Sequence, residues 1–273
     1  MKNESERERT NPSRQRDYWN ALAADYAAIT RISADDFHYG PQIPGENALH
    51  LLPDFPQGAS ALELGCGGAE NSVWLAKKGL VCTALDISEK QLERARALAA
   101  ANGVAIDLRP AALERFEDAL GGGEQFDFVH SSHALEFVDD PGPVIGAMAR
   151  RTKRGGVVMA SSVHPVFNGE WTTGAWEDDG GGGDGAEESQ GVFLESYFNP
   201  PDDIRDDAFG HVVSRAWPVS AWFGWFTAAG LQVTALAEPP AVEDAPYTSA
   251  DWAAHGGELF AIPSTIILVG RKT

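Results

Sequence analysis

Apolar and polar positions change their spacing at regular intervals from residue 58 onward. Short apolar runs, typical of buried strands, lie at 61–64, 80–86, 104–109, 126–132 and 155–162. Segments with apolar residues at helical spacing separate most of them, at 70–78, 89–102 and 141–152. This alternation predicts a parallel sheet covered on both faces, because each helix returns the chain to the same end of the sheet.

Local signals place the ends of several further elements. Ser88, with a glutamine three residues later, predicts a capping box, and Ser220 predicts the cap of a helix over 221–229. Two more strands are expected at 231–237 and 264–272, the last one antiparallel to its neighbour at the edge of the sheet. The pattern as a whole predicts an α/β fold with a doubly wound, seven-stranded sheet whose last strand is antiparallel.

Two segments fall outside the alternation and are expected to cap the sheet. Residues 1–57 form an N-terminal helical cap, and residues 164–215 form a lid inserted after the fifth strand. Residues 58–163 are then the binding core, and residues 216–273 its C-terminal part. The lid holds four consecutive glycines, Gly180 to Gly183, among six carboxylates, which predicts a hydrated, mobile loop.

Composition narrows the range of partners. The 273 residues include 21 basic and 40 acidic side chains, a formal charge of −19, so a nucleic-acid partner is not expected. No apolar run is long enough for a membrane span, so none is expected, and the polar, charged first residues predict that there is no signal peptide. Cys66 and Cys82 lack metal-ligand spacing, which favours a reduced, cytoplasmic setting without a metal site. The oligomeric state stays open.

Candidate chemistry begins at the stretch LELGCGGAEN, where the first strand turns into its helix. Gly65, Gly67 and Gly68 allow a sharp turn and a close approach of a ligand to the backbone. In a dinucleotide fingerprint the next required glycine would stand at Glu70. A carboxylate at that helix N-terminus opposes a pyrophosphate, so a zwitterionic or cationic ligand is favoured.

The same stretch resembles motif I of the class I S-adenosylmethionine-dependent methyltransferases, with Glu63 as its acidic residue and Ala69 in place of its last glycine. Residues 126–161 are similar to the family's fourth strand, the following helix and its fifth strand. The resemblance covers about residues 18–163. It implies a Rossmann-like fold, S-adenosyl-L-methionine as the cofactor, and methyl transfer to an O, N or C atom of a small molecule.

The resemblance also implies which residues bind the cofactor. Asp86, which ends the second strand, is expected to bind the ribose hydroxyls. The family often has an acidic residue near the adenine where this chain has Ala111, so either Glu114 replaces it or nearby backbone groups bind adenine. The expected cofactor-binding set is Glu63, Gly65, Cys66, Gly67, Asp86, Ile87, Ala112, Leu113, Ser131 and Ser132.

Three residues are candidates for a catalytic base, although the reaction needs one only if the acceptor must lose a proton. His164 follows the fifth strand and is favoured, the alternative being a histidine held by the turn at Pro165. His133 follows the fourth strand and is otherwise a hydrogen-bonded loop residue. Tyr39 and the adjacent His38 either line the pocket with Tyr18 and Trp19 or pack the N-terminal helix onto the sheet.

Aromatic residues are frequent after the fifth strand and suit an aromatic or hydrophobic acceptor. Trp222 and Trp225 are alternatively the buried face of the last helix, and Arg215 meets either an anionic substrate group or a carboxylate. The other aromatic residues of this group are Trp171, Trp176, Phe193, Tyr197, Phe198 and Trp217. Two other functions stay open: a nicotinamide-dependent oxidoreductase, and a protein that binds the cofactor without transferring its methyl group.

Overall fold

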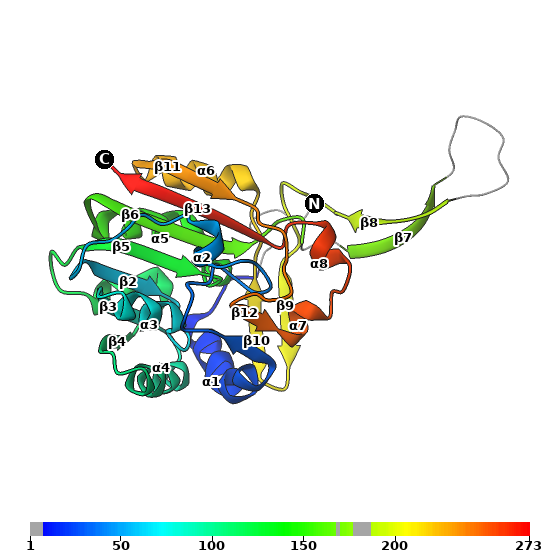
Figure 1. Ribbon diagram of the computed structural model, residues 1–273. Helices are drawn as coiled ribbons and strands as arrows, with labels where there is room; N and C mark the ends of the chain where they lie inside the picture. Colours follow the sequence, from blue (N-terminus) through cyan, green and yellow to red (C-terminus); the bar gives the residue numbers. More distant parts are fainter. Residues whose placement is uncertain (1–7, 168–169, 177–186) are drawn as a thin grey trace.

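The computed structural model describes residues 8–167, 170–176 and 187–273, and its centre is a seven-stranded sheet (Figure 1). The strands stand in the order β11-β13-β6-β5-β2-β3-β4. Five neighbouring strands, from β4 to β6, are parallel, and β13 is antiparallel to both of its neighbours. The strands are β2 (Ser60–Leu64), β3 (Val81–Asp86), β4 (Ile106–Pro110), β5 (Phe126–Ser132), β6 (Thr152–Val163), β11 (Leu231–Ala237) and β13 (Thr265–Lys272). The predicted α/β fold with an antiparallel last strand is confirmed.

The position predicted for the last strand is wrong. β13 lies between β6 and β11, so β11 forms the edge. The cause is visible in the side chains: Ile266 and Ile267, which point to opposite faces, are both fully buried. In β11 exposed positions such as Gln232 alternate instead with positions that are buried, as at Leu231, or half-buried. A strand that is apolar on both faces takes an interior position, and a one-sided strand takes the edge.

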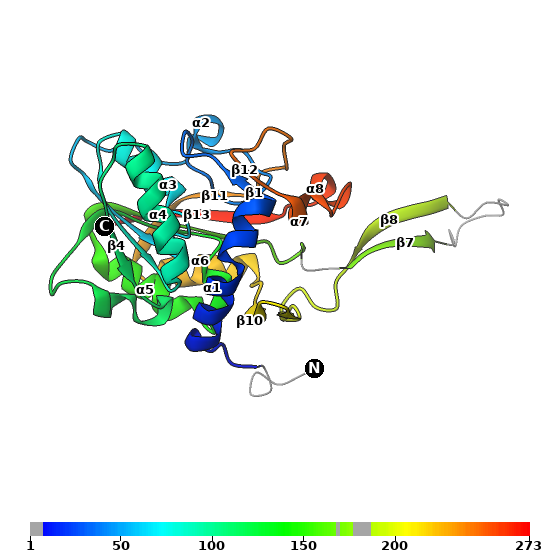
Figure 2. The ribbon, with the colours of Figure 1, turned by 90° about the horizontal axis from the view of Figure 1, so that it is seen from below.

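Helices cover both faces of the sheet, as Figure 2 shows. Leu62 and Leu64 of β2 point to the face that packs against α5 and α6, whereas Ala61 points to the opposite face, toward Trp74 of α3. This alternation along one strand produces two hydrophobic cores, one on each side of the sheet. The helices are α3 (Glu70–Lys77), α4 (Glu89–Ala101), α5 (Pro141–Arg151) and α6 (Val219–Ala228).

The predicted helix caps are confirmed only in part. Ser88 Oγ accepts a hydrogen bond from the backbone N–H of Gln91 at 3.2 Å, but the Gln91 side chain accepts one from Arg94 at 2.6 Å. The capping box is therefore half formed. Ser220 is not a cap, because α6 already begins at Val219, with the Pro218 carbonyl accepting its first hydrogen bonds.

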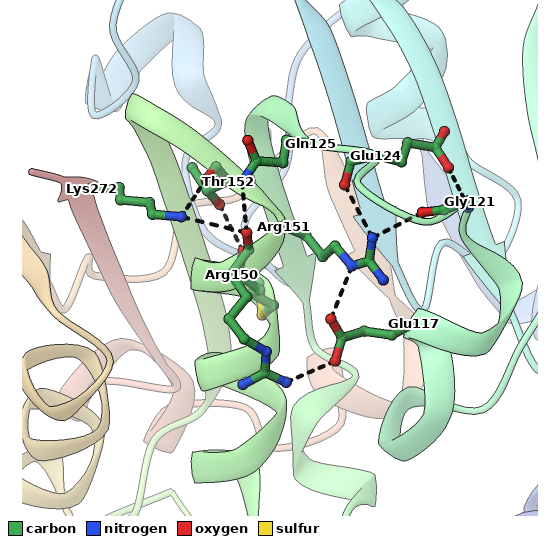
Figure 3. A network of polar contacts seen from close by, with 9 residues as sticks. Glu117, Gly121, Glu124, Gln125, Arg150, Arg151, Thr152 and Lys272 are labelled. Carbon is green, nitrogen blue, oxygen red and sulfur yellow. Dashed lines mark hydrogen bonds and ion pairs between the residues drawn. The ribbon is translucent and has the colours of Figure 1, made fainter.

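Ion pairs and hydrogen bonds join the segment before β5 to the end of α5, which leads into β6 (Figure 3). Glu117, in the 3-10 helix η2 (Leu113–Ala119), accepts from Arg150 at 2.7 Å and from Arg151 at 2.9 Å. These pairs lower the pKa of Glu117. Both arginines stand in the last turn of α5, where the helix dipole favours cations. The network holds η2 against α5.

The N-terminal and C-terminal parts of the chain meet above the carboxyl ends of the strands. Tyr18 and Leu22 of α1 pack against Val212 of β10. β1 pairs with β12 in a small antiparallel sheet, which brings residues after β11 into the cap alongside the predicted N-terminal segment. The elements of this region are α1 (Pro12–Ile29), β1 (Thr30–Ile32), α2 (Glu46–Leu49), η3 (Leu135–Phe137), β9 (Asp203–Asp207), β10 (Gly210–Ser214), β12 (Tyr247–Ser249), α7 (Ala250–Ala253) and α8 (Glu258–Ala261).

A hairpin of β7 (Glu170–Trp176) and β8 (Glu187–Phe193) projects from the body of the molecule (Figure 1). The glycine run for which a mobile loop is predicted, Gly180 to Gly183, lies outside the described residues. Within the described ranges, no helix is both long and apolar enough to cross a membrane.

Candidate functional site

A cavity of about 110 Å³ lies where β2 turns into α3, beneath α1 and β12. Its walls come from segments far apart in the chain, because the carboxyl ends of the parallel strands and the cap meet there. It is lined by Trp19, Tyr26, Ile32, His38, Gly65, Cys66, Gly67, Gly68, Glu70, Asp86, Gln91, Arg94, Ser132, His133, Ala134, Phe137 and Tyr247.

The glycine turn forms the floor of this cavity. Gly65 has φ +67°, and a Cβ added there would stand 2.3 Å from the Cβ of Ala134. No other residue type fits that position without displacing its neighbour. Asp86 reaches the turn from β3 and accepts hydrogen bonds from the backbone N–H groups of Gly67 and Ser88, both at 2.8 Å. The carboxylate thereby fixes the turn against the end of β3.

Negative charge accumulates at the floor. Glu70 and Asp86 both line the cavity, and burial raises the pKa of each. Glu63 lies outside the lining residues and accepts hydrogen bonds from Ser72, through its N–H at 3.1 Å and its hydroxyl at 2.5 Å. Burial, reinforced by the Glu70 charge, raises the pKa of Glu63 to about 8. Among the described lining residues only Arg94 is a permanent cation, so the site favours a cationic ligand.

Aromatic rings form the roof. Trp19 of α1 contacts Tyr26 and Phe137, with ring centroids 5.9 and 5.2 Å apart. The Tyr26 hydroxyl is hydrogen-bonded to the hydroxyl of Tyr247, and burial raises the pKa of Tyr26 to about 12. Trp19 was expected at the pocket, but sequence reasoning missed Tyr26, Tyr247 and Arg94. No motif marks these residues, because only the folding of the cap brings them together.

Of the three predicted catalytic residues, His133 lines the cavity. Its φ of +50° is unusual for a residue with a Cβ, and both ring nitrogens have neighbours. Nε2 stands 3.0 Å from Thr265 Oγ1, and Nδ1 stands 3.2 Å from Glu136 Oε1. The ring is therefore held in place from two sides.

The other two predicted catalytic residues are placed elsewhere. The Tyr39 ring is fully buried and its hydroxyl donates to Glu46 at 2.5 Å. His164 Nε2 lies 2.6 Å from Glu238 Oε1, while its Nδ1 accepts from the N–H of Val166 at 3.2 Å. Burial lowers the pKa of His164 against the opposing effect of Glu238. Neither side chain lines the cavity described above.

The predicted cofactor residues divide in the same way. Gly65, Cys66, Gly67, Asp86 and Ser132 line the cavity, and burial raises the pKa of the Cys66 thiol. The remaining ones, Glu63, Ile87, Ala112, Leu113 and Ser131, are not among the lining residues.

Two of those remaining residues lie close to the site. Ser131 donates to the Leu64 carbonyl at 3.0 Å. Leu113 would lie 4.0 Å from a Cβ added at Gly65, and Ala111 donates its N–H to the Asp86 carbonyl at 2.9 Å. The segment expected near adenine thus runs along the edge of the glycine turn.

Of the aromatic residues predicted to suit an acceptor, those whose side chains the structure describes do not line the cavity: Phe193, Tyr197, Phe198, Trp217, Trp222 and Trp225. Trp222 is buried in the core between α6 and the sheet, which confirms the alternative interpretation for it. Phe193 and Phe198 are 60% and 81% exposed. Arg215 is buried and pairs with Asp139 at 2.7 Å and with Asp202 at 3.1 Å. The side chains of Trp171 and Trp176 lie outside the described residues.

Comparison with known proteins gives matches over the core. Residues 62–160 match the family described as a methyltransferase domain. Over 107 residues the chain is 37% identical to the ubiquinone biosynthesis O-methyltransferase of Pseudomonas paraeruginosa, a stretch that covers 39% of this chain and 45% of that protein. The corresponding protein of Caulobacter vibrioides is 34% identical over 108 residues, which cover 40% and 42% of the two chains. The matched stretch therefore spans less than half of these relatives.

Solved structures are similar over a longer part of the chain. An S-adenosylmethionine-dependent methyltransferase from Mesorhizobium loti superimposes with a TM-score of 0.60 at 21% identity, over 82% of this chain and 94% of the other. The 1,6-didemethyltoxoflavin-N1-methyltransferase of Burkholderia thailandensis, solved with its acceptor and S-adenosylhomocysteine, gives a TM-score of 0.50 at 14% identity, over 80% and 72%. At these identities the likeness concerns the fold.

Proposed function

We propose that this chain, whose core at residues 62–160 is a class I S-adenosylmethionine-dependent methyltransferase domain, transfers a methyl group to an oxygen atom of a small aromatic or hydrophobic molecule. The observation that carries the proposal is the floor of the cavity, where a glycine turn meets the buried carboxylates of Glu70 and Asp86. That floor lies inside the stretch that matches the methyltransferase domain.

The residues at the floor fit S-adenosylmethionine, whose sulfonium and ammonium groups are both cations. Glu70 and Asp86 offer negative charge in a buried setting with little competing positive charge. Asp86 accepts one backbone hydrogen bond on each oxygen, which leaves lone pairs for the ribose hydroxyls. The same carboxylates repel a pyrophosphate, which argues against the nicotinamide alternative.

When bound, the cofactor supplies an electrophilic methyl group on sulfur, so the protein has to position the acceptor and exclude water. The rings of Trp19, Phe137 and Tyr247 offer an apolar surface to an acceptor entering above the floor. Relatives named as ubiquinone biosynthesis O-methyltransferases support an oxygen acceptor. The formal charge of −19 argues against a nucleic-acid acceptor.

Calorimetric titration tests the cofactor part of the proposal. We expect S-adenosylhomocysteine to bind, and NAD and NADP to bind at least about 100-fold more weakly because of charge repulsion. Tighter binding of either dinucleotide would overturn the proposal. Transfer is then measured with labelled S-adenosylmethionine and a panel of catechols. A protein that binds the cofactor but methylates nothing in the panel would favour binding without transfer.

A further inference from the structure

His38 lines the cavity and carries a buried polar atom without a hydrogen-bond partner among the described residues. The residue lies in the segment that connects β1 to α2, and it is 9% exposed. Its ring nitrogen Nδ1 is buried and has no hydrogen-bond partner among the residues that the structure describes. A buried nitrogen without a partner is costly, and such groups in native proteins generally meet a ligand, a water or an ion.

The position of His38 is fixed by Asn71, at the start of α3. Asn71 Oδ1 accepts from the backbone N–H of His38 at 2.8 Å, and Asn71 Nδ2 donates to the His38 carbonyl at 2.9 Å. The Asn71 side chain is fully buried and follows Glu70, which ends the glycine turn. Two hydrogen bonds to one residue leave the backbone of His38 little freedom. The imidazole is therefore preorganised relative to the glycine turn and whatever binds there.

A second buried histidine, His130, differs from His38 in that it does not line the cavity. His130 of β5 is fully buried, and neither of its ring nitrogens has a hydrogen-bond partner among the described residues. It stacks on Phe128, with ring centroids 4.6 Å apart, and meets the edge of Phe37 at 5.1 Å. His130 is a packing residue outside the cavity lining. His38 contacts the ring of Tyr247 at 5.1 Å and faces the cavity.

We propose that His38 is a catalytic residue that hydrogen-bonds to a hydroxyl group of the acceptor and takes its proton during methyl transfer, with Asn71 as its positioning residue. The inference rests on the proposed function. As the acceptor oxygen forms its bond to carbon, the bond between carbon and sulfur breaks and its electron pair stays on sulfur. The O–H proton passes to the unprotonated ring nitrogen of His38, and the resulting imidazolium releases it to solvent.

The surroundings of His38 also select the class of acceptor. Burial, with the nearby His133, lowers the pKa of His38 to about 3, so the ring is neutral at physiological pH and keeps a free lone pair. Such a weak base accepts a proton only from a group that becomes strongly acidic on methylation. A hydroxyl oxygen does so, because it passes through an oxonium. An amine becomes an ammonium that keeps its proton, so a hydroxyl acceptor fits this site better.

Nuclear magnetic resonance on protein with ¹⁵N-labelled histidine, saturated with S-adenosylhomocysteine, tests the contact directly. Phenol is the probe, and anisole, which has the same ring without an O–H donor, is its control. We expect phenol to shift the ring-nitrogen resonance of His38 and anisole to leave it unchanged. The resonance is assigned by its loss in His38→Leu, and the His130 resonance serves as an internal reference.

Affinities complete the test. His38→Leu should bind phenol about tenfold more weakly, the loss expected for one hydrogen bond, and should bind anisole as the parent does. His130→Phe, the matched control, should bind both probes unchanged. If the parent protein binds no S-adenosylhomocysteine, the proposed function fails. If it binds S-adenosylhomocysteine but phenol leaves the His38 resonance in place, or binds His38→Leu equally well, the role of His38 is refuted while the proposed function stands.

Discussion

The floor and the roof of the cavity are built in different ways. The floor consists of the glycine turn with Glu70 and Asp86, all within a short stretch of the chain and joined by hydrogen bonds to the backbone. The roof consists of Trp19, Phe137 and Tyr247 with their aromatic neighbours, which come from three distant segments and make ring contacts. The floor is acidic and rigid, whereas the roof is largely apolar.

This difference separates two tasks. A floor made of backbone groups and carboxylates recognises features that do not change from one acceptor to another, namely the ribose and the positive charges of the cofactor. A roof of aromatic rings offers shape and apolar area, which determine the acceptor that fits. If the separation holds, changes at the floor should alter cofactor affinity strongly, and changes at the roof should leave it nearly constant.

The largest effect is expected at the glycine turn. Gly65→Ala places a Cβ 2.3 Å from Ala134 at a φ of +67°, so the turn must move. We expect an affinity for S-adenosylhomocysteine about 100-fold lower, measured by calorimetry. Gly123→Ala is the matched control, because Gly123 has φ +81° but nothing within 4 Å of an added Cβ. Equal affinities of the two variants would show that the floor does not depend on this close approach.

Removal of the Asp86 carboxylate should have the next largest effect. Asp86→Ala loses the acceptor for the Gly67 N–H and for the proposed ribose contact. Cofactor affinity should fall about 10- to 100-fold while the fold persists, as circular dichroism would show. Asp107→Ala is the control. It removes an exposed carboxylate of β4, the strand next to that of Asp86, where Asp107 is paired with Arg109, and it should bind the cofactor like the parent. An unchanged affinity of Asp86→Ala would contradict the assignment.

Glu63, which lies beside the floor, should make the free energy of unfolding depend on pH. Its pKa rises from 4.5 to about 8 on folding, so between these values the folded state holds a proton that the unfolded state has lost. Stability contributed by this group is present below the unfolded pKa and is lost as pH rises to about 8. We therefore expect Glu63→Gln to gain stability relative to the parent as pH increases, by at least about 1 kcal/mol at pH ~8.

Urea unfolding of the parent and of Glu63→Gln at intervals between about pH 5 and 8 measures this difference. A difference that stays constant with pH would mean that Glu63 is ionised throughout this range, so that burial does not raise its pKa. Addition of S-adenosylhomocysteine to the same series would show how its positive charge acts on this carboxyl.

Much of the floor could be predicted from the sequence, because its determinants are local. Gly65 and Gly67 follow a buried strand directly, and Asp86 ends the next strand, so spacing alone brings them to one edge of a parallel sheet. The same reasoning predicted the strands of the central sheet and the helices that cover it, α3 to α6. It failed for the order of the last two strands, although the apolar residues on both faces of β13 were a usable signal.

Trp19 and His133 were expected near the pocket, but the rest of the roof could not be predicted, because distant partners determine it. Tyr39 is a buried aromatic residue that donates to Glu46, and His164 is paired with Glu238, which directly follows β11. Tyr26 and Tyr247 meet across 221 positions of sequence. A residue type and its place after a strand indicate that a side chain is near the edge of the sheet, but not which neighbour it meets.

The smallest effect on the cofactor is expected at the hydroxyl pair of the roof, which joins α1 to β12. Tyr26→Phe leaves the Tyr247 hydroxyl buried without this partner, and Tyr247→Phe does the converse. Each should cost about 0.5–1.5 kcal/mol of unfolding free energy, whereas the double variant should cost less than the sum, because no orphan hydroxyl remains. Urea unfolding of the four proteins measures this coupling.

In both single variants S-adenosylhomocysteine affinity should change less than about threefold, since the floor is intact. A tenfold loss in either would show that the roof also binds the cofactor, and the separation between the two regions would have to be given up.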